Sequence, residues 1–177
     1  MIYFTADLHF YHDKVINFAN RPFDNADEMN RALIDNWNRK VSAQDEVYIL
    51  GDVTMKGPEY ATEVLSQLRG KKYLIKGNHD RFAEKKTFDG TIFEWVKDYH
   101  ELSYQNTRFV LFHYPIEEWS GYFKGAVHLH GHQHNHEDYN IKNREKGLLR
   151  FDVGVDANHM APVGIEDIIS FFSMSEM

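Results

Sequence analysis

Five short apolar stretches of the chain are each followed by side chains that bind metal ions or move protons. These polar groups, in chain order, are Asp7-Leu8-His9, Gly51-Asp52, Gly77-Asn78-His79-Asp80, His113 and Gly131-His132-Gln133-His134. A rigid strand aims the side chains of the loop that follows it, so polar residues there are often functional. One such group alone could be an ordinary turn. Five of the same kind predict one shared site.

The residue types indicate which ions this site would hold. Neutral imidazoles and carboxylates together suit Mn²⁺, Fe²⁺ or Zn²⁺, whereas Ca²⁺ prefers a cage of oxygen atoms. The chain has no cysteine, so thiolate sites and disulfides are excluded. The ligands are too many for a single tetrahedral ion. Two ions roughly 3.5–4 Å apart, sharing a carboxylate, would use them all.

Histidine recurs at every second position from residue 128 to residue 136, a spacing that also resembles a metal-sequestering run. The run is internal, and Gly131 interrupts the alternation of a strand at its middle. We therefore expect His132 and His134 to be ligands. The other members, His128, His130 and His136, are expected to pack in the core or to support ligands. His12 follows His9 by three residues and has no assigned role.

The elements that would position these groups follow from local patterns. Strands are predicted at residues 2–5, 46–50, 73–75, 99–104, 108–112, 126–130 and 148–155. A helix is predicted at 26–40, where Met29, Leu33 and Trp37 recur every four residues. A second helix, 58–69, begins at Pro58, and with the strands on either side it predicts a βαβ unit.

Two segments are less defined by their sequence. Residues 81–97 are mixed and charged, and we expect a helix or loop over a sheet face. Residues 165–172 are expected to close the chain as a strand or a short helix. No internal repeat or linker is present, so residues 1–177 are predicted to form a single domain.

The composition limits the class of protein. Of the 177 residues, 42% are hydrophobic, which is typical of a folded globule, and the net charge of −7 disfavours tracking along nucleic acid. No apolar run approaches the roughly 20 residues of a membrane span. The first residues lack a basic segment, so no signal peptide is predicted. We expect a cytoplasmic protein without membrane or long nucleic-acid partners.

As a set, the five groups resemble the calcineurin-like metallophosphoesterases, whose signature is D-x-H, G-D, G-N-H-D/E, a lone H, and G-H-x-H. All five are intact and in order here. The stretches 8–12 and 152–158 also look like the opening and closing motifs of small bacterial and phage members, which often have glycine where Tyr11 stands. The fold implied is α/β, a two-sheet sandwich with flanking helices and a dinuclear metal site at the carboxyl ends of the strands.

The resemblance also implies roles for single residues. Asp7, His9 and His134 would hold one ion, Asn78, His113 and His132 the other, and Asp52 would bridge both. The cofactors implied are two divalent transition-metal ions, Mn²⁺ first and Fe²⁺, Zn²⁺ or Ni²⁺ as alternatives. A hydroxide between the ions would attack phosphorus in line. His79 would act as hydrogen-bond donor or general acid, with Asp80 orienting its ring.

The function expected is therefore hydrolysis of phosphate esters, with small phosphodiesters, among them cyclic nucleotides, as substrates. Phosphomonoester or protein phosphatase activity is the alternative within this class. Two alternatives lie outside phosphate-ester hydrolysis. One is a non-catalytic scaffold with the same fold, and the other is a protein that stores or senses metal. Four basic residues could contact substrate or could be surface charges: Arg21, Arg81, Lys124 and Lys142. The sequence does not predict the oligomeric state.

Overall fold

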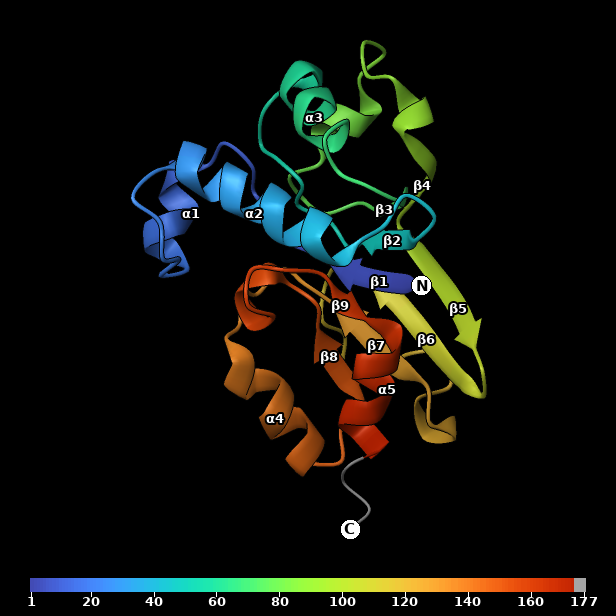
Figure 1. Ribbon diagram of the computed structural model, residues 1–177. Helices are drawn as coiled ribbons and strands as arrows, with labels where there is room; N and C mark the ends of the chain where they lie inside the picture. The colour runs from blue at the N-terminus through green and yellow to red at the C-terminus, as the bar shows by residue number, and fades with distance from the viewer. Residues whose placement is uncertain (174–177) are drawn as a thin grey trace.

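Two β-sheets packed face to face form the centre of the molecule, which we describe from a computed structural model covering residues 1–173 (Figure 1). The five-stranded sheet has the order β4-β3-β2-β1-β9. Its strands are β1 (Ile2–Thr5), β2 (Glu46–Ile49), β3 (Lys71–Ile75), β4 (Phe93–Lys97) and β9 (Val163–Gly164). Strands β1 to β4 run parallel, and β9 pairs antiparallel with β1.

The second sheet has four strands in the order β5-β6-β7-β8. They are β5 (Tyr99–Tyr104), β6 (Thr107–Phe112), β7 (Val127–His130) and β8 (Arg150–Asp152). The predicted hairpin is confirmed as the antiparallel pair β5 and β6, whereas β6, β7 and β8 run parallel. A parallel bridge between Ala6 and Gly154 joins the two sheets just beyond β1. The carboxyl ends of strands from both sheets therefore meet in one place.

Apolar side chains from both sheets fill the space between them. Phe4, Tyr48 and Leu50 come from the five-stranded sheet, and they pack against residues such as Phe109 and Leu129 of the other. Parallel strands buried on both faces read as continuous apolar runs, which explains why these segments lack alternation in the sequence. This core fixes the strands whose ends carry the polar groups.

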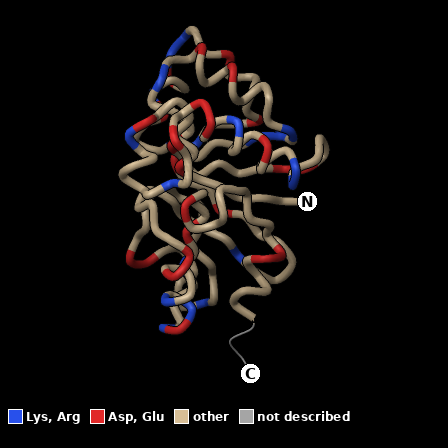
Figure 2. Tube along the Cα trace, turned by 60° about the vertical axis from the view of Figure 1, so that its left-hand side comes forward, with Lys and Arg blue, Asp and Glu red and all other residues tan. Residues whose placement is uncertain are grey.

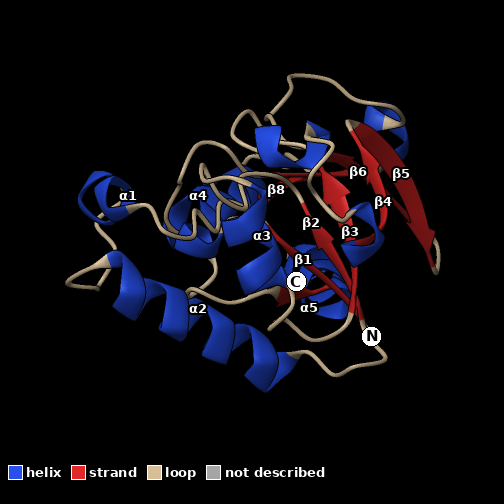
Figure 3. Cartoon of the chain, turned by 90° about the horizontal axis from the view of Figure 1, so that it is seen from above, coloured by secondary structure: helices blue, strands red, loops and turns tan. Residues whose placement is uncertain are grey.

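Helices cover the outer face of the five-stranded sheet (Figures 1 and 3). The helix α2 (Ala26–Lys40) begins at Asn25, whose side chain accepts a hydrogen bond from the Glu28 N–H, and buries Leu33 and Trp37. The helix α3 (Pro58–Leu65) packs in the same apolar cluster. Together β2, α3 and β3 form the predicted βαβ unit, with β2 and β3 paired in parallel. Helices α4 (Glu137–Glu145) and α5 (Ile165–Ser173) lie beside β8 and β9.

Several elements differ from the sequence-based prediction. A helix or loop over a sheet face was predicted for residues 81–97, which is wrong: the segment ends in β4, an edge strand of the five-stranded sheet. Short 3₁₀ turns at Arg81–Glu84 and Gly90–Ile92 precede this strand. Of the two alternatives expected for the final segment, strand or short helix, the structure has the helix, α5. The helix after Pro58 ends at Leu65, four residues earlier than predicted. The helices α1 (Asp13–Phe18) and α4 and the two-residue strand β9 had not been predicted.

The molecule's charges are mixed over its surface. Figure 2 shows lysine and arginine interspersed with aspartate and glutamate along the trace, without a continuous basic band in that view. Within residues 1–173, no helix has the length and apolar character needed to cross a membrane.

Candidate metal centre

The polar groups identified in the sequence lie together where the two sheets meet. Asp7 and His9 follow β1, Asp52 follows β2, Asn78 follows β3, His113 follows β6, and His132 and His134 follow β7. Backbone hydrogen bonds join these loops directly: the Asp7 N–H donates to Gly51 O at 3.0 Å, and the His9 N–H to Asp52 O at 2.9 Å. The strands thus deliver residues more than a hundred positions apart to one edge.

Two groups of side chains each have the geometry of a metal site. One consists of Asp7, His9 and His134, and within it one ligand atom of each residue lies within 4.8 Å of the others. We call it the first cluster. The second cluster consists of Asp52, His113 and His132 on the same criterion. These two clusters match the grouping that the resemblance implied for two ions.

The carboxylate of Asp52 lies between the clusters. Its Oδ2 atom is 3.5 Å from Nε2 of His9, in the first cluster, and 3.6 Å from Nε2 of His113, in the second. The Oδ1 atom of Asn78 lies 3.0 Å from the same Nε2 atom of His113. A carboxylate placed between two imidazole nitrogens has the position needed to bridge two ions.

The chemistry of His9 fits a bound cation. Its side chain is 2% exposed, and neither ring nitrogen has a hydrogen-bond partner among the described residues. Burial lowers the pKa of His9 to about 2, so the ring is neutral and can donate a lone pair. Buried polar atoms without partners are costly and rare. A metal ion would supply the missing partner.

Bound cations would also stabilise the buried carboxylates of the centre. Burial, reinforced by the nearby Asp152, raises the pKa of Asp7 well above its ordinary value. Asp52 is buried as well, so two carboxylates share a confined space. Divalent cations between them would offset this repulsion and the loss of hydration. The donor set of carboxylates, imidazoles and one amide suits borderline transition metals.

A buried network of ion pairs fixes the ring of His134. The Nδ1 atom of His134 donates to Oδ2 of Asp156 at 2.8 Å, which leaves Nε2 free as a ligand atom. Arg21 holds the same carboxylate through its Nε at 2.8 Å and also donates to the Asp7 carbonyl at 2.6 Å. Burial would raise the pKa of Asp156, but its hydrogen bonds with His134 and Arg21 hold that pKa below its usual value. Arg21 therefore supports the first cluster and is neither a substrate contact nor a surface charge.

His113 is oriented in a similar way by the backbone. Its Nδ1 atom lies 2.7 Å from the Leu50 carbonyl, an acceptor, so Nδ1 carries the proton and Nε2 faces Asp52 and Asn78. Desolvation lowers the pKa of His113 and of His132, which favours the neutral rings that metal binding requires. Both histidines of the second cluster are therefore in the protonation state that coordination requires.

Comparison with other proteins places the chain in a known family. Residues 1–157 match the calcineurin-like phosphoesterase superfamily domain. The chain belongs to this superfamily. Membership in this superfamily confirms the fold expected for the chain, and it supports metal-dependent hydrolysis of phosphate esters.

Relatives of this calcineurin-like phosphoesterase occur in archaea, phages and bacteria. It is 33% identical to an uncharacterized protein of Methanocaldococcus jannaschii, over 99% of this chain and 93% of the relative. It is 28% identical to the gene 66 protein of Mycobacterium phage D29, with 89% of each chain covered. A crystal structure of an Aquifex aeolicus protein of unknown function has a TM-score of 0.74 at 24% identity, covering 96% of this chain and 98% of that one. These similarities support the fold and do not identify the substrate.

The loops of this phosphoesterase hold unusual backbone conformations at the clusters. Five non-glycine residues of the two clusters have left-handed φ angles between 49° and 74°: Asp7, His9, Asp52, His132 and His134. Such conformations cost roughly 1–3 kcal/mol each and persist where function requires them. Tyr11, at the position where small members often have glycine, also has a φ of 63°, so the loop adopts a glycine-like conformation despite the larger side chain.

Two glycines permit the close approach of these loops. Gly51 has a φ of 93°, and a Cβ atom there would collide with the His113 ring. A Cβ atom on Gly77 would collide with the carboxylate of Asp52. The glycines in the G-D and G-N-H-D motifs therefore make room for the second cluster.

Asp80 has a different role from the one expected. Its carboxylate accepts hydrogen bonds from three backbone N–H groups, those of Asp52, Val53 and Gly77, each at 2.8 Å. Burial raises the pKa of Asp80 to about 6. No hydrogen bond joins it to the His79 ring among the described residues. Asp80 therefore fastens the loop after β3 to the loop after β2, rather than orienting the imidazole.

His79 lies at the opening of the site. Its backbone N–H donates to Oδ1 of Asp52 at 2.9 Å, and its half-buried ring lies edge-on to that of His9, with centroids 5.5 Å apart. The ring of His12 also lies near that of His9, at a centroid distance of 5.5 Å, and its buried Nδ1 has no partner among the described residues. The sequence signals for this position were its spacing of three residues after His9 and its place at the end of the stretch 8–12.

The remaining histidines of the alternating run divide by exposure. His128 and His130 are buried, and a ring nitrogen of each lies beside a backbone carbonyl, that of Val110 for His128 and that of Gly131 for His130. His136 is exposed and precedes α4. None of the three belongs to either cluster, as expected.

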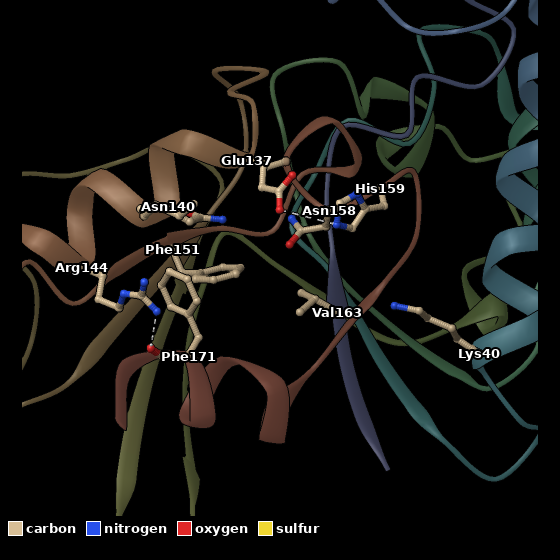
Figure 4. Close-up of a pocket in the computed structure, with 11 residues that line it drawn as sticks. Lys40, Glu137, Asn140, Arg144, Phe151, Asn158, His159, Val163 and Phe171 are labelled. Atoms are coloured by element: carbon tan, nitrogen blue, oxygen red, sulfur yellow. Dashed lines mark hydrogen bonds and ion pairs between the residues drawn. The ribbon is translucent and has the colours of Figure 1, made fainter. Parts of the chain in front are cut away.

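Three cavities are relevant to binding. A cavity of about 450 Å³ is lined in part by Asn78, Arg81 and Tyr114, and one of about 420 Å³ by Asn78, His79 and Arg81. Both therefore open beside the second cluster. A third, of about 270 Å³, lies between α4 and α5 and contains none of the cluster residues (Figure 4). Its arginine, Arg144, already donates to the carbonyl of Phe171.

Proposed function

We propose that this protein hydrolyses small phosphodiesters using two divalent metal ions, with Mn²⁺ as the expected ion. The observation that carries the proposal is the position of Asp52 between the two clusters, 3.5 Å from His9 and 3.6 Å from His113. A site for one ion would not need a shared carboxylate. Cyclic nucleotides are among the diesters that the proposal includes.

Each cluster would hold one ion. Asp7, His9 and His134 would bind the first, and His113, His132 and Asn78 the second, with Asp52 contributing to both. Two bound cations supply Lewis acidity, which polarises phosphoryl oxygens and makes a bound water more acidic. The network of Arg21 and Asp156 keeps His134 oriented for this task.

His79 is the proposed general acid. When a water oxygen forms its bond to phosphorus, the bond from phosphorus to the leaving oxygen breaks, and the His79 ring gives that oxygen a proton. The water's own proton passes to solvent. The backbone of His79 is fixed to Asp52, which holds the acid close to the bound phosphoryl group. An alkoxide is a poor leaving group that a proton donor at this place would serve, and by the family resemblance an intact histidine here fits diesterase chemistry.

Phosphomonoesters or phosphorylated proteins are the alternative substrates, because the same clusters would bind their phosphate. A scaffold role is disfavoured by the site itself. The two clusters are complete, and a buried His9 without hydrogen-bond partners would only destabilise a protein that binds no metal.

A panel of esters on reloaded protein tests the proposal. Chelator-stripped protein, given Mn²⁺, would be assayed with a simple aryl phosphodiester, the matching monoester, and 2′,3′- and 3′,5′-cyclic nucleotides. We expect hydrolysis of diesters that depends on added metal and is lost in His79→Asn. Faster turnover of the monoester, unaffected by His79→Asn, would support the alternative instead.

A further inference from the structure

The cavity beside His79 has an unusual charge. Five residues line this space of about 420 Å³: Met55, Lys56, Asn78, His79 and Arg81. Two of them are cations and none is an acid, in a chain whose net charge is −7. The permanent positive charge of this cavity therefore comes from Lys56 and Arg81.

In the described part of the chain, neither cation is held in an ion pair. Within residues 1–173, Lys56 and Arg81 form no ion pair. The Nζ atom of Lys56 lies over the ring of Tyr60, 5.7 Å from the ring centroid. The adjoining cavity provides a comparison. There Lys76 forms ion pairs with Glu84 and Asp98, each at 3.1 Å, so its positive charge is already neutralised.

The position of Arg81 is fixed relative to the metal centre. It follows Asp80, whose carboxylate ties this loop to Asp52, Val53 and Gly77 through their backbone N–H groups. The backbone that carries Arg81 is thus held to the loop that supplies the bridging carboxylate. An arginine on a rigid loop can form paired hydrogen bonds to a carboxylate or phosphate at little cost in entropy.

From these observations we infer that Lys56 and Arg81 form a subsite for an anionic group on the leaving alcohol of the substrate. The inference rests on the proposed function, because His79, which lines the same cavity, is the group proposed to protonate the leaving oxygen. The substrates are then esters whose leaving group carries its own carboxylate or phosphate. Met55, half exposed in the same lining, offers an apolar wall for the body of that group.

Matched esters test the inference. Two methyl aryl phosphodiesters would be compared on the Mn²⁺-loaded protein, with 4-nitrophenol or 4-carboxy-2-nitrophenol as the leaving group. A third, with a phosphonate in place of the carboxylate, separates the two kinds of anion. We expect the charged leaving groups to raise kcat/KM roughly tenfold over the neutral one, since two charge-assisted contacts are gained.

Variants then locate the effect. Arg81→Ala and Lys56→Ala should each remove most of this preference while changing kcat/KM for the neutral ester by less than about threefold. Arg81→Lys should keep part of it. Lys85→Ala removes an exposed lysine four residues away that lines neither cavity, and it should leave the preference intact. An equal loss on charged and neutral esters in Arg81→Ala would overturn the inference.

A binding measurement separates the failure of this inference from failure of the proposed function. The free leaving group, 4-hydroxy-3-nitrobenzoate, would be titrated into loaded protein and followed by its absorbance. We expect Arg81→Ala to weaken its binding roughly tenfold. If no ester is hydrolysed but this difference is present, the function is wrong and the subsite stands. If esters are hydrolysed and the difference is absent, the subsite is wrong.

Discussion

The carboxylate of Asp80 accepts the backbone N–H of Asp52 at 2.8 Å, so the G-N-H-D and G-D motifs are joined directly. The same carboxylate accepts two further N–H groups, from Val53 and Gly77. The acid that ends the tetrapeptide thus holds in place the loop that carries Asp52, the carboxylate proposed to bridge the two ions. Its contribution is to geometry, and it acts before any substrate binds.

Replacement of Asp80 by asparagine should therefore damage stability as well as activity. An amide keeps one acceptor oxygen but turns its NH₂ group toward a backbone donor, leaving a buried N–H without a partner. We expect Asp80→Asn to lower the free energy of unfolding by about 2–4 kcal/mol. Urea denaturation of metal-free protein measures this. Asp98→Asn, an exposed change near the same loop, is the control and should cost far less. A fully stable Asp80→Asn variant would contradict the fastening role.

The bridging position of Asp52 leads to a prediction about metal content. Because Asp52 lies between both clusters, Asp52→Asn should lower the occupancy of both ions. Asp7→Asn alters only the first cluster and should lose chiefly one ion. Elemental analysis after equilibration with limiting Mn²⁺ distinguishes the two results. The clean loss of a single ion from Asp52→Asn would remove Asp52 from the bridge.

The hydrogen bond between His134 and Asp156 predicts that the Asp156→Asn variant binds one ion much more weakly than the other. Asp156→Asn removes the negative charge that orients the His134 ring and makes it a better donor. Loss of such a supporting carboxylate typically weakens metal binding by about 10–100-fold. Calorimetric titration should show this loss for the first cluster, with the second cluster changed by less than about threefold. Asp138→Asn, on the exposed face of α4, serves as the control. Equal weakening of both ions would refute the assignment.

Acid should destabilise the metal-free fold through buried histidines remote from the clusters. Burial lowers the pKa of His128 to about 4, with smaller effects from His130 and Arg150, while the unfolded chain titrates near 6.5. Between these values the unfolded state binds more protons, so stability falls as the pH falls. For His128 alone the loss is about 2 kcal/mol by pH 5.

Denaturant unfolding at pH 7 and pH 5 tests this contribution. His128→Gln should reduce the acid-induced loss of stability by roughly 2 kcal/mol relative to the unaltered chain. His136→Gln, an exposed member of the same alternating run, should leave the loss unchanged. An identical pH dependence in all three proteins would show that His128 is not protonated on unfolding in this range.

Much of the fold was predictable because the parallel strands have short apolar runs bounded by turn residues. Where each run ended, a polar group of the right type marked the edge of the sheet, so all members of both clusters were found from sequence order. The edge strand β4 was missed because Phe93 and Trp95 lie in a charged segment, at a sheet edge where three of the five residues are exposed. The six-residue α1 is too short for a helical period to be visible.

The supporting residues were not predictable, because their partners are distant in the chain. Arg21 is an isolated arginine in a loop, and only the fold brings it to Asp156, 135 positions away. Asp80 was expected to act on its neighbour His79, yet its partners include Asp52 and Val53, on another strand's loop. Sequence order identifies the polar groups at strand ends that are proposed as ligands. It does not reveal which buried charges hold those ligands in place.

A stepwise metal titration with turnover followed in the same samples decides whether two ions act together. Chelator-stripped protein would receive increasing Mn²⁺, the ions bound per chain would be counted, and hydrolysis of an aryl phosphodiester would be measured at each step. We predict two ions per chain, with hydrolysis rising as the second site fills. Full hydrolysis in the stripped protein, or two bound ions without hydrolysis of any ester, would contradict the dinuclear mechanism.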